Sequence, residues 1–236
     1  MEPFVIAISG ASHSGKTTFI NNIKNILGDF VVVYDEVIRK YVANIDEVRK
    51  NQKDYFNLQI KVIGEKIVHE NFCRIDNQNQ NKIVIFDRTL ADSLYYYTRY
   101  VDANQLIGKD VEDYYTYAEI FIKQMNYSMK NIYDKILYFY PIDLKYNSDP
   151  MRPDNILFNQ KLEAFMIKSI LTNSMVQTNT LNKLYEVDII KEKDPLEVLF
   201  NCIYFSKTTP IWEEFMEAYF NLINDRRQKS STSISG

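Results

Sequence analysis

Short apolar runs alternate with helical patterns along most of the chain. The run at 4–9 (FVIAIS) is almost entirely apolar, as expected for a strand buried on both faces. Further runs of this kind occupy residues 30–34, 82–86, 135–140 and, more weakly, 184–187. Stretches with apolar residues three or four positions apart separate these runs. This alternation predicts an α/β fold in which helices on both faces cover a five-stranded parallel sheet.

Two of the intervening helical patterns predict which helix faces are buried. Their apolar positions are Phe56, Ile60, Ile63 and Ile67 in the first pattern, and Val111, Tyr115, Ala118, Ile122 and Met125 in the second. A last helix over 196–205 is expected to complete the core. Because 236 residues suit one core with an appendage, we expect one domain over 1–205 and an extension over 206–236.

The extension carries an apolar stripe that predicts a C-terminal helix. The stripe consists of Trp212, Phe215, Met216, Tyr219, Phe220 and Ile223. It covers either the core of the same chain, which is the favoured interpretation, or a second copy of the chain in a homodimer. The segment 226–236 has very little apolar content and is expected to be disordered.

Composition and charge narrow the range of partners. A formal charge of -3 gives no general attraction for polyanions, so nucleic acid is a possible but not a favoured partner. No apolar run approaches the roughly 18 residues of a membrane span, and no cleavable leader precedes the first strand, so a cytoplasmic protein is expected. Cys73 and Cys202 are too far apart and too isolated to indicate a zinc site or a disulfide framework, and we expect both to be buried.

The segment 10–17 (GASHSGKT) fits the phosphate-loop pattern GxxxxGK[ST]. It follows a predicted buried strand and opens a helix, so its backbone N–H groups can curl around phosphates. Lys16 would neutralise the β and γ phosphates, and the Thr17 hydroxyl would help to hold magnesium, so we expect ATP and Mg²⁺ as cofactors. We expect Lys16 to be solvated when no nucleotide is bound. The predicted nucleotide-binding residues are Gly10, Ser12, His13, Ser14, Gly15, Lys16, Thr17 and Thr18.

Charged residues follow the third predicted strand, at the sheet edge where ligands of such folds collect. Asp87 has the form of a Walker B acid and could hold magnesium, although strand-end aspartates also cap helices. Arg88 could contact the acceptor or the transferring phosphoryl group. The alternative for Arg88 is a surface ion pair.

Two acids follow the second predicted strand. Asp35 and Glu36 are candidates to accept the proton of an attacking hydroxyl group, because this strand end faces the acceptor in kinase folds. A helix-capping role for either acid is equally compatible with the pattern.

These segments together resemble the P-loop nucleoside and nucleotide kinases. The phosphate loop GASHSGKTT, the segment DEVIRKYV and a long helix with Gln59 and Glu65 are most similar to the branch of AAA-type ATPases that includes the nicotinamide riboside kinase domain. The segment FDRTLADSLYYY is similar to the DR motif of thymidylate kinases and the ER motif of deoxynucleoside kinases. The resemblance covers about residues 4–205. It implies a three-layer P-loop sandwich with strand order 2-3-1-4-5.

The resemblance also implies roles for particular residues. Glu36 and Arg39 match an E-x-x-R pattern of the nicotinamide-riboside-like branch, which selects Glu36 over Asp35 as the acceptor-side carboxylate. Asp35, Glu36, Arg39 and Arg88 are then the expected acceptor-binding residues. The segment 145–154 resembles the mobile lid of these kinases, with Arg152 as its one arginine, although an inert loop broken by prolines fits it equally well.

The expected activity is transfer of the γ-phosphate of ATP to a hydroxyl or phosphate of a nucleoside, nucleotide or related small molecule. A polynucleotide-directed kinase, acting on a DNA or RNA end or on a hydroxymethylated base, is an alternative. A basic side for such a strand would consist of Arg39, Lys40, Arg49, Lys50 and Lys53. A nucleotide-dependent regulatory ATPase is a second alternative, with ATP preferred because an N-K-x-D segment is absent.

Overall fold

The computed structural model describes residues 2–141, 156–187 and 194–204, with the isolated positions 217, 220, 221 and 224. Within these residues, parallel strands form a single sheet in the order β2-β3-β1-β4-β5, which confirms the predicted order. The strands are β1 (Phe4–Gly10), β2 (Val31–Tyr34), β3 (Ile83–Asp87), β4 (Lys135–Phe139) and β5 (Leu184–Val187).

Side chains that alternate along the strands divide the core between the two faces of the sheet. In β1, Phe4, Ile6 and Ile8 point to one face, and Val5 and Ala7 point to the other. All are buried, which explains why the sequence of β1 is a continuous apolar run.

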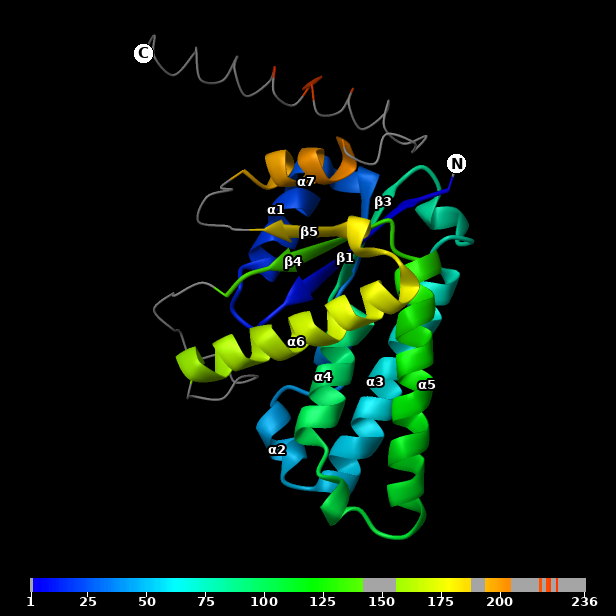
Figure 1. Ribbon diagram of the computed structural model, residues 1–236. Helices are drawn as coiled ribbons and strands as arrows, with labels where there is room; N and C mark the ends of the chain where they lie inside the picture. Colours follow the sequence, from blue (N-terminus) through cyan, green and yellow to red (C-terminus); the bar gives the residue numbers. More distant parts are fainter. Residues whose placement is uncertain are drawn as a thin grey trace.

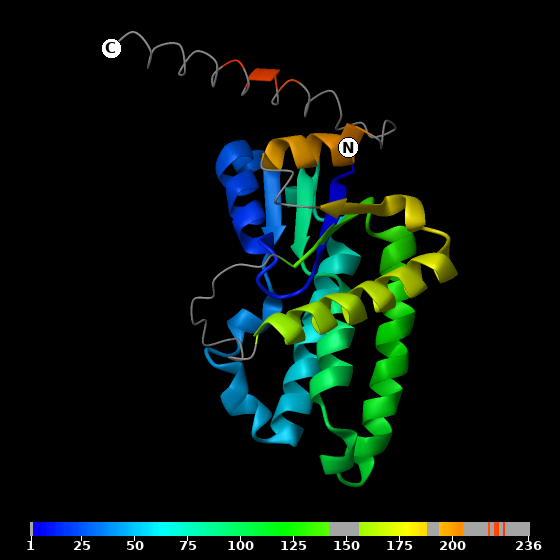
Figure 2. The same cartoon turned by 60° about the vertical axis from the view of Figure 1, so that its left-hand side comes forward.

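Helices cover both faces, as predicted, and give three layers. Helices α1 (Lys16–Leu27) and α7 (Pro195–Tyr204) pack on the face of Phe4 and Ile6. The opposite face is covered by four helices, most of them much longer than α1, and this layer extends beyond the sheet, as Figures 1 and 2 show. These are α3 (Gln52–Phe72), α4 (Leu90–Tyr100), α5 (Lys109–Asn131) and α6 (Ile156–Thr178).

Short elements complete the connections between the strands and the long helices. The short helix α2 (Ile45–Arg49) precedes α3. The 3-10 turns are η1 (Gly28–Phe30), η2 (Val37–Lys40), η3 (Asn77–Asn79), η4 (Ala103–Gln105) and η5 (Leu181–Lys183).

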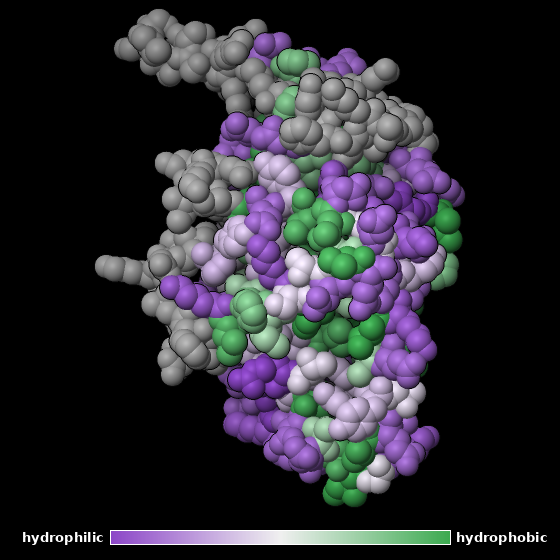
Figure 3. Space-filling view, viewed as in Figure 1, coloured by the Kyte–Doolittle hydropathy of each residue, from purple (hydrophilic) through white to green (hydrophobic). Residues whose placement is uncertain are grey.

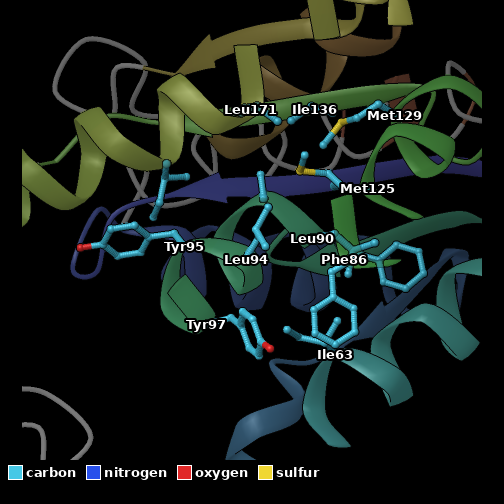
Figure 4. Close-up of a cluster of buried hydrophobic side chains, with 14 of the residues drawn as sticks. Ile63, Phe86, Leu90, Leu94, Tyr95, Tyr97, Met125, Met129, Ile136 and Leu171 are labelled. Carbon is cyan, nitrogen blue, oxygen red and sulfur yellow. The ribbon is translucent and has the colours of Figure 1, made fainter. Parts of the chain in front are cut away.

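The larger core cluster lies between the sheet and the long helices (Figure 4). The cluster contains Phe86 of β3, Ile63 of α3, Leu94 of α4, Met125 of α5 and Leu171 of α6. Each of these side chains is buried, so one apolar contact region joins four helices to the sheet. The close packing of this region holds the helices that carry the candidate site against the sheet.

The predicted buried face of α5 is partly wrong. Met125 is buried, but Tyr115 and Ile122 are 63% and 42% exposed. The buried face is rotated toward Phe121, because α5 brings Phe121 and Tyr117 against aromatic residues of α3 and α4. The rings of Phe121 and Tyr117 find aromatic partners on α3 and α4, and such ring pairs add to the apolar area that is buried, so they decide the orientation.

Several predictions concern residues outside those described. The lid segment 145–154 with Arg152 and most of the extension 206–236 belong to this group. Cys73 and Cys202 are described and are buried, as predicted, and burial raises the pKa of each thiol to about 12.

The described part of the chain contains no candidate membrane-spanning helix. No helix there combines the length and the apolar character needed to cross a bilayer. On the face shown in Figure 3, hydrophobic residues are interspersed with hydrophilic ones.

Candidate active site

The phosphate loop joins β1 to α1, and its backbone requires glycine at two positions. Gly10 has φ 131°, and a Cβ atom there would lie 2.3 Å from the carbonyl oxygen of Phe139. Gly15 has φ 84° and precedes the first turn of α1 without any side-chain cap. The N–H groups of that turn therefore remain available to an anion.

Lys16 is buried, so the expectation that it is solvated is wrong. Its ammonium group donates hydrogen bonds to the carbonyl oxygens of Gly10 (2.8 Å) and Ala11, and to Oγ of Ser14 (3.0 Å). Burial, reinforced by the nearby Arg88 charge, lowers the pKa of Lys16 to about 7. The lysine folds back on its own loop because the loop carbonyls replace water as acceptors.

The other predicted loop residues fall into two groups. Ser14 is buried and donates to the carbonyl oxygen of Ala11 at 2.8 Å. Ser12 and His13 line a cavity beside the loop. Thr17 and Thr18 are exposed on the first turn of α1.

Arg88 connects the ends of two neighbouring strands. Its Nε donates to Oε1 of Glu36 at 2.6 Å, and its Nη1 lies 3.5 Å from Oδ1 of Asp92 and 3.4 Å from the carbonyl oxygen of Gly10. The side chain is only 7% exposed, so the surface ion-pair alternative is wrong. Glu36 also accepts from Nε of Arg39 at 3.1 Å.

Asp87 lies at the end of β3, in register with Ile8 of β1. Burial raises the pKa of this carboxyl group, partly offset by the adjacent Arg88. Asp87 is not a helix cap: Thr89 and Asp92 form the capping box of α4.

The two acids after β2 are placed differently. Glu36 lines the cavity and makes no side-chain cap for the turn it precedes, so the capping alternative is wrong for Glu36. Asp35 is exposed and is not among the residues that line the cavity.

The cavity has a volume of about 110 Å³ and opens beside the phosphate loop. One wall is a single face of α3, because positions 55, 59, 62 and 66 recur at helical spacing. A second wall comes from α4 and a third from α2 and the turn after β2. The lining residues are Ser12, His13, Glu36, Val37, Ile38, Arg39, Ile45, Arg49, Tyr55, Gln59, Val62, Lys66, Asp87, Arg88, Ser93, Tyr96, Tyr100, Gln160 and Glu163.

Helix α6 contributes two residues that the sequence analysis missed. Oε1 of Glu163 accepts from the backbone N–H of Ser12 (2.9 Å), from Oγ of Ser12 (3.0 Å) and from the hydroxyl of Tyr96 (2.5 Å). Gln160 donates to the carbonyl oxygen of Ser12 at 2.8 Å. The peptide groups on both sides of Ser12 are therefore fixed by α6. No local signal could reveal this, since 151 residues separate Glu163 from Ser12.

Other unpredicted residues lie on the wall formed by α3. The family resemblance points to Gln59, but no sequence motif includes Tyr55 or Lys66. The helical spacing of Tyr55, Gln59 and Lys66 was the available signal. The apolar residues of α3 form a stronger pattern on the same helix, so this spacing did not stand out. Glu65, which was noted with Gln59, instead pairs with Lys40 and is absent from the cavity wall.

Three features define the P-loop kinase fold. They are the phosphate loop, the pair of Glu36 and Arg88 at the neighbouring strand ends, and the strand order β2-β3-β1-β4-β5. The chain belongs to the AAA-domain family, whose model matches residues 5–178. No curated protein matches the chain significantly.

Solved structures support the same fold at low sequence identity. The NadR protein in complex with NR matches with a TM-score of 0.53 and 19% identity, over 79% of this chain and 46% of the NadR chain. This chain therefore spans less than half of that protein. Deoxyadenosine kinase from M. mycoides matches with a TM-score of 0.52 and 17% identity, over 85% of this chain and 99% of its own. The same enzyme with bound dCTP gives a TM-score of 0.51 and 19% identity, with the same coverage.

Proposed function

We propose that this chain is an ATP- and magnesium-dependent kinase that phosphorylates a small nucleoside, nucleotide or related molecule. The observation that carries this proposal is the meeting of Glu36, Asp87 and Arg88 with the tip of the phosphate loop in one cavity. A phosphoryl donor on the loop and an acceptor in the cavity would face each other across these three charged groups.

The residues present suit ATP and magnesium. The uncapped first turn of α1 offers N–H groups to the phosphates, and Lys16 needs only to leave its own loop carbonyls to reach them. Thr17 and Asp87 would complete the shell of a magnesium ion that is otherwise held by phosphate oxygens and water. Held there, Mg²⁺ would supply positive charge that offsets the negative charge developing in transfer.

The side chains on the acceptor side have distinct roles in the proposed reaction. The acceptor hydroxyl forms a new bond to the γ phosphorus while the bond to the β–γ bridging oxygen breaks and ADP leaves. Glu36 orients the hydroxyl and receives its proton, and Arg88 offsets the negative charge of the phosphoryl group. Tyr96 stays protonated, because burial raises the pKa of its phenol, and it lies beneath the Arg88 guanidinium at 5.1 Å from Cζ to the ring centroid.

A small acceptor is favoured over a nucleic-acid strand. Each of the five basic residues considered for strand binding has an acidic partner, as the ion pairs Arg39–Glu36, Lys40–Glu65, Arg49–Asp46, Lys50–Glu47 and Lys53–Asp110 show. Paired lysines and arginines offer little net charge to phosphates, so this side lacks the electrostatic attraction that strand binding requires. A mobility shift with single-stranded DNA that weakened steeply with salt would favour the polynucleotide alternative.

A thermal-shift screen tests the proposal. The chain is heated with a non-hydrolysable ATP analogue and Mg²⁺, alone and with nucleosides or nucleotides. We expect the analogue to raise the melting temperature and at least one acceptor to raise it further, because ligands stabilise the state they bind. An analogue that gives no shift at millimolar concentration would contradict the proposed nucleotide site.

A further inference from the structure

The segment 36–42, which follows β2 and contains the turn η2, forms one wall of the cavity. Four consecutive residues of it, 36–39, line the cavity. The backbone N–H groups of Tyr41 and Val42 donate to the carbonyl oxygen of Ile38, at 3.0 and 3.3 Å. These bonds close the turn on itself and do not tie it to another element. The position of this wall over the cavity therefore depends on side-chain contacts.

Glu65 of α3 holds the end of this segment that lies away from Glu36. The Tyr41 hydroxyl donates to Oε2 of Glu65, and Nζ of Lys40 donates to Oε1. The ammonium group of Lys61 lies 4.0 Å from the centroid of the Tyr41 ring, as a cation–π contact. Lys61 and Glu65 are one helical turn apart, so one face of α3 engages both the ring and the hydroxyl of Tyr41.

The Glu65 side chain lies outside the cavity, although its neighbour Lys66 lines it. Helix α3 thus forms one cavity wall itself and fastens a second wall through Glu65. Hydrogen bonds from Lys40 and from Tyr41 lower the pKa of Glu65, so its carboxylate is ionised at neutral pH. A hydroxyl that donates to an ionised carboxylate makes a stronger bond than one between neutral groups.

This hydrogen bond can fix the segment in a way that its apolar contacts cannot. Ile38 and Val42 pack against the larger core cluster, which keeps the segment on the protein. Apolar burial has no preferred direction, whereas a hydrogen bond does. The bond to Glu65 therefore sets how the segment lies along α3. At the other end of the same turn, it places Glu36 where Nε of Arg88 reaches it at 2.6 Å.

We infer that Glu65 is a positioning residue, which anchors the segment 36–42 on α3 through Tyr41 and so holds Glu36 toward the acceptor. The inference rests on the proposed function for the role of Glu36. Lys40 contributes less to the anchor than Tyr41, because its side chain is 63% exposed and solvent screens its ion pair.

Kinetics of the full chain test the inference with ATP, Mg²⁺ and the common ribonucleosides, deoxyribonucleosides and their monophosphates. For the compound that the original chain phosphorylates fastest, Tyr41→Phe and Glu65→Ala should each lower the acceptor kcat/KM about tenfold. The KM for ATP should stay within about threefold. Glu65→Gln keeps an oxygen that accepts from Tyr41 and should restore most of the loss. Glu47→Ala, which removes an exposed ion pair with Lys50, is the matched control, and Lys40→Met should have little effect.

A double substitution shows whether Glu65 acts through Glu36. In a Glu36→Gln chain, the further change Glu65→Ala should lower the rate of transfer by less than about threefold, because the group that it positions is already lost. A general loss of stability would instead add its full effect in that chain and lower the melting temperature. Fully additive losses at unchanged melting temperature would overturn the inference.

Amide hydrogen exchange of the ligand-free chain tests the anchor without any acceptor. Tyr41→Phe and Glu65→Ala should speed exchange over residues 38–42 about tenfold or more and leave the strands unchanged, because only the turn is released. Equal exchange in variants and original chain would overturn the inference, as would faster exchange with undiminished turnover. Absence of ADP formation with every compound contradicts the proposed function instead, and the exchange rates still decide whether Glu65 holds the segment.

Discussion

Arg88 donates a 2.6 Å hydrogen bond from Nε to Oε1 of Glu36, across the ends of two neighbouring strands. Arg39 engages the other carboxylate oxygen of Glu36 at 3.1 Å. Arg88 holds a left-handed backbone conformation, with φ 82°, which costs energy for a residue other than glycine. The two arginines fix the Glu36 carboxylate in one orientation, as a group that positions an acceptor hydroxyl requires.

The proposed role of Glu36 predicts that its replacement slows phosphoryl transfer without weakening ATP binding. Glu36→Gln should leave ATP affinity within a few-fold of the original and lower acceptor-dependent turnover by roughly two to four orders of magnitude. The amide keeps the size of the side chain but removes its charge and its capacity to take a proton. Steady-state kinetics with varied ATP and varied acceptor measure the two effects separately.

Asp35→Asn is the matched control for Glu36→Gln. Asp35 is exposed and is absent from the cavity wall, so this variant should keep nearly full turnover. A crippled Asp35→Asn with an active Glu36→Gln would show that the family pattern selects the wrong acid.

The sequence was sufficient to predict the sheet, because buried parallel strands produce apolar runs that need no tertiary information. The same holds for the phosphate loop, where backbone curvature requires glycine at fixed spacing. The orientation of Glu36 could not be predicted, because it depends on Arg88, which is 52 residues away along the chain. The environment of Lys16 was predicted wrongly, since loop carbonyls can take the place of water only in the folded chain.

Lys16 should take up a proton when ATP binds at alkaline pH. Its pKa is lowered to about 7 by burial in the ligand-free protein, and the phosphates would raise it again. We expect uptake of up to about one proton at pH 8 to 8.5 and almost none from this residue below pH 6. Calorimetry in buffers of different ionisation enthalpy measures it, and Lys16→Met should abolish it. Uptake that is equal in Lys16→Met would contradict this assignment.

The same lowered pKa has a consequence for stability without nucleotide. Between about pH 7 and 10.5 the unfolded chain holds a proton on Lys16 that the folded chain has lost, so stability from this residue rises with pH in that window. Below pH 7 the burial of the charged lysine is fully unfavourable, on the order of a few kcal/mol. Lys16→Met should therefore unfold at a higher urea concentration than the original chain at pH 7, and a lower midpoint would contradict this.

Asp87 should determine the magnesium dependence of the reaction. Asp87→Asn removes a charged ligand from the proposed metal shell, so the magnesium concentration for half-maximal rate should rise about tenfold or more. Mg²⁺ titration of the initial rate at saturating ATP measures this. Because Thr89 and Asp92 cap α4, the helix should be unaffected, and the melting temperature serves as the control. An unchanged magnesium response would exclude Asp87 from the metal shell.

Glu163 should position the phosphate loop through its hydrogen bonds to Ser12. Glu163→Ala removes two hydrogen bonds to that residue, each worth about 1 kcal/mol, and should raise the KM for ATP by roughly tenfold or more. Glu163→Gln keeps an accepting oxygen and should restore most of the loss. Glu119→Ala, which removes an exposed ion pair with Lys123, is the matched control. Equal defects in the Gln and Ala variants would show that charge, not hydrogen bonding, is what matters.

The central claim is phosphoryl transfer to a small acceptor, and simultaneous measurement of ADP and phosphorylated acceptor tests it most directly. The chain is incubated with ATP, Mg²⁺ and each candidate nucleoside or nucleotide, and both products are quantified by mass spectrometry. We predict that ADP and phosphorylated acceptor form in equal amounts for at least one acceptor, and that Lys16→Ala abolishes both while remaining folded. ADP release at the same slow rate with every compound, with no phosphorylated acceptor, would contradict the claim and indicate a regulatory ATPase.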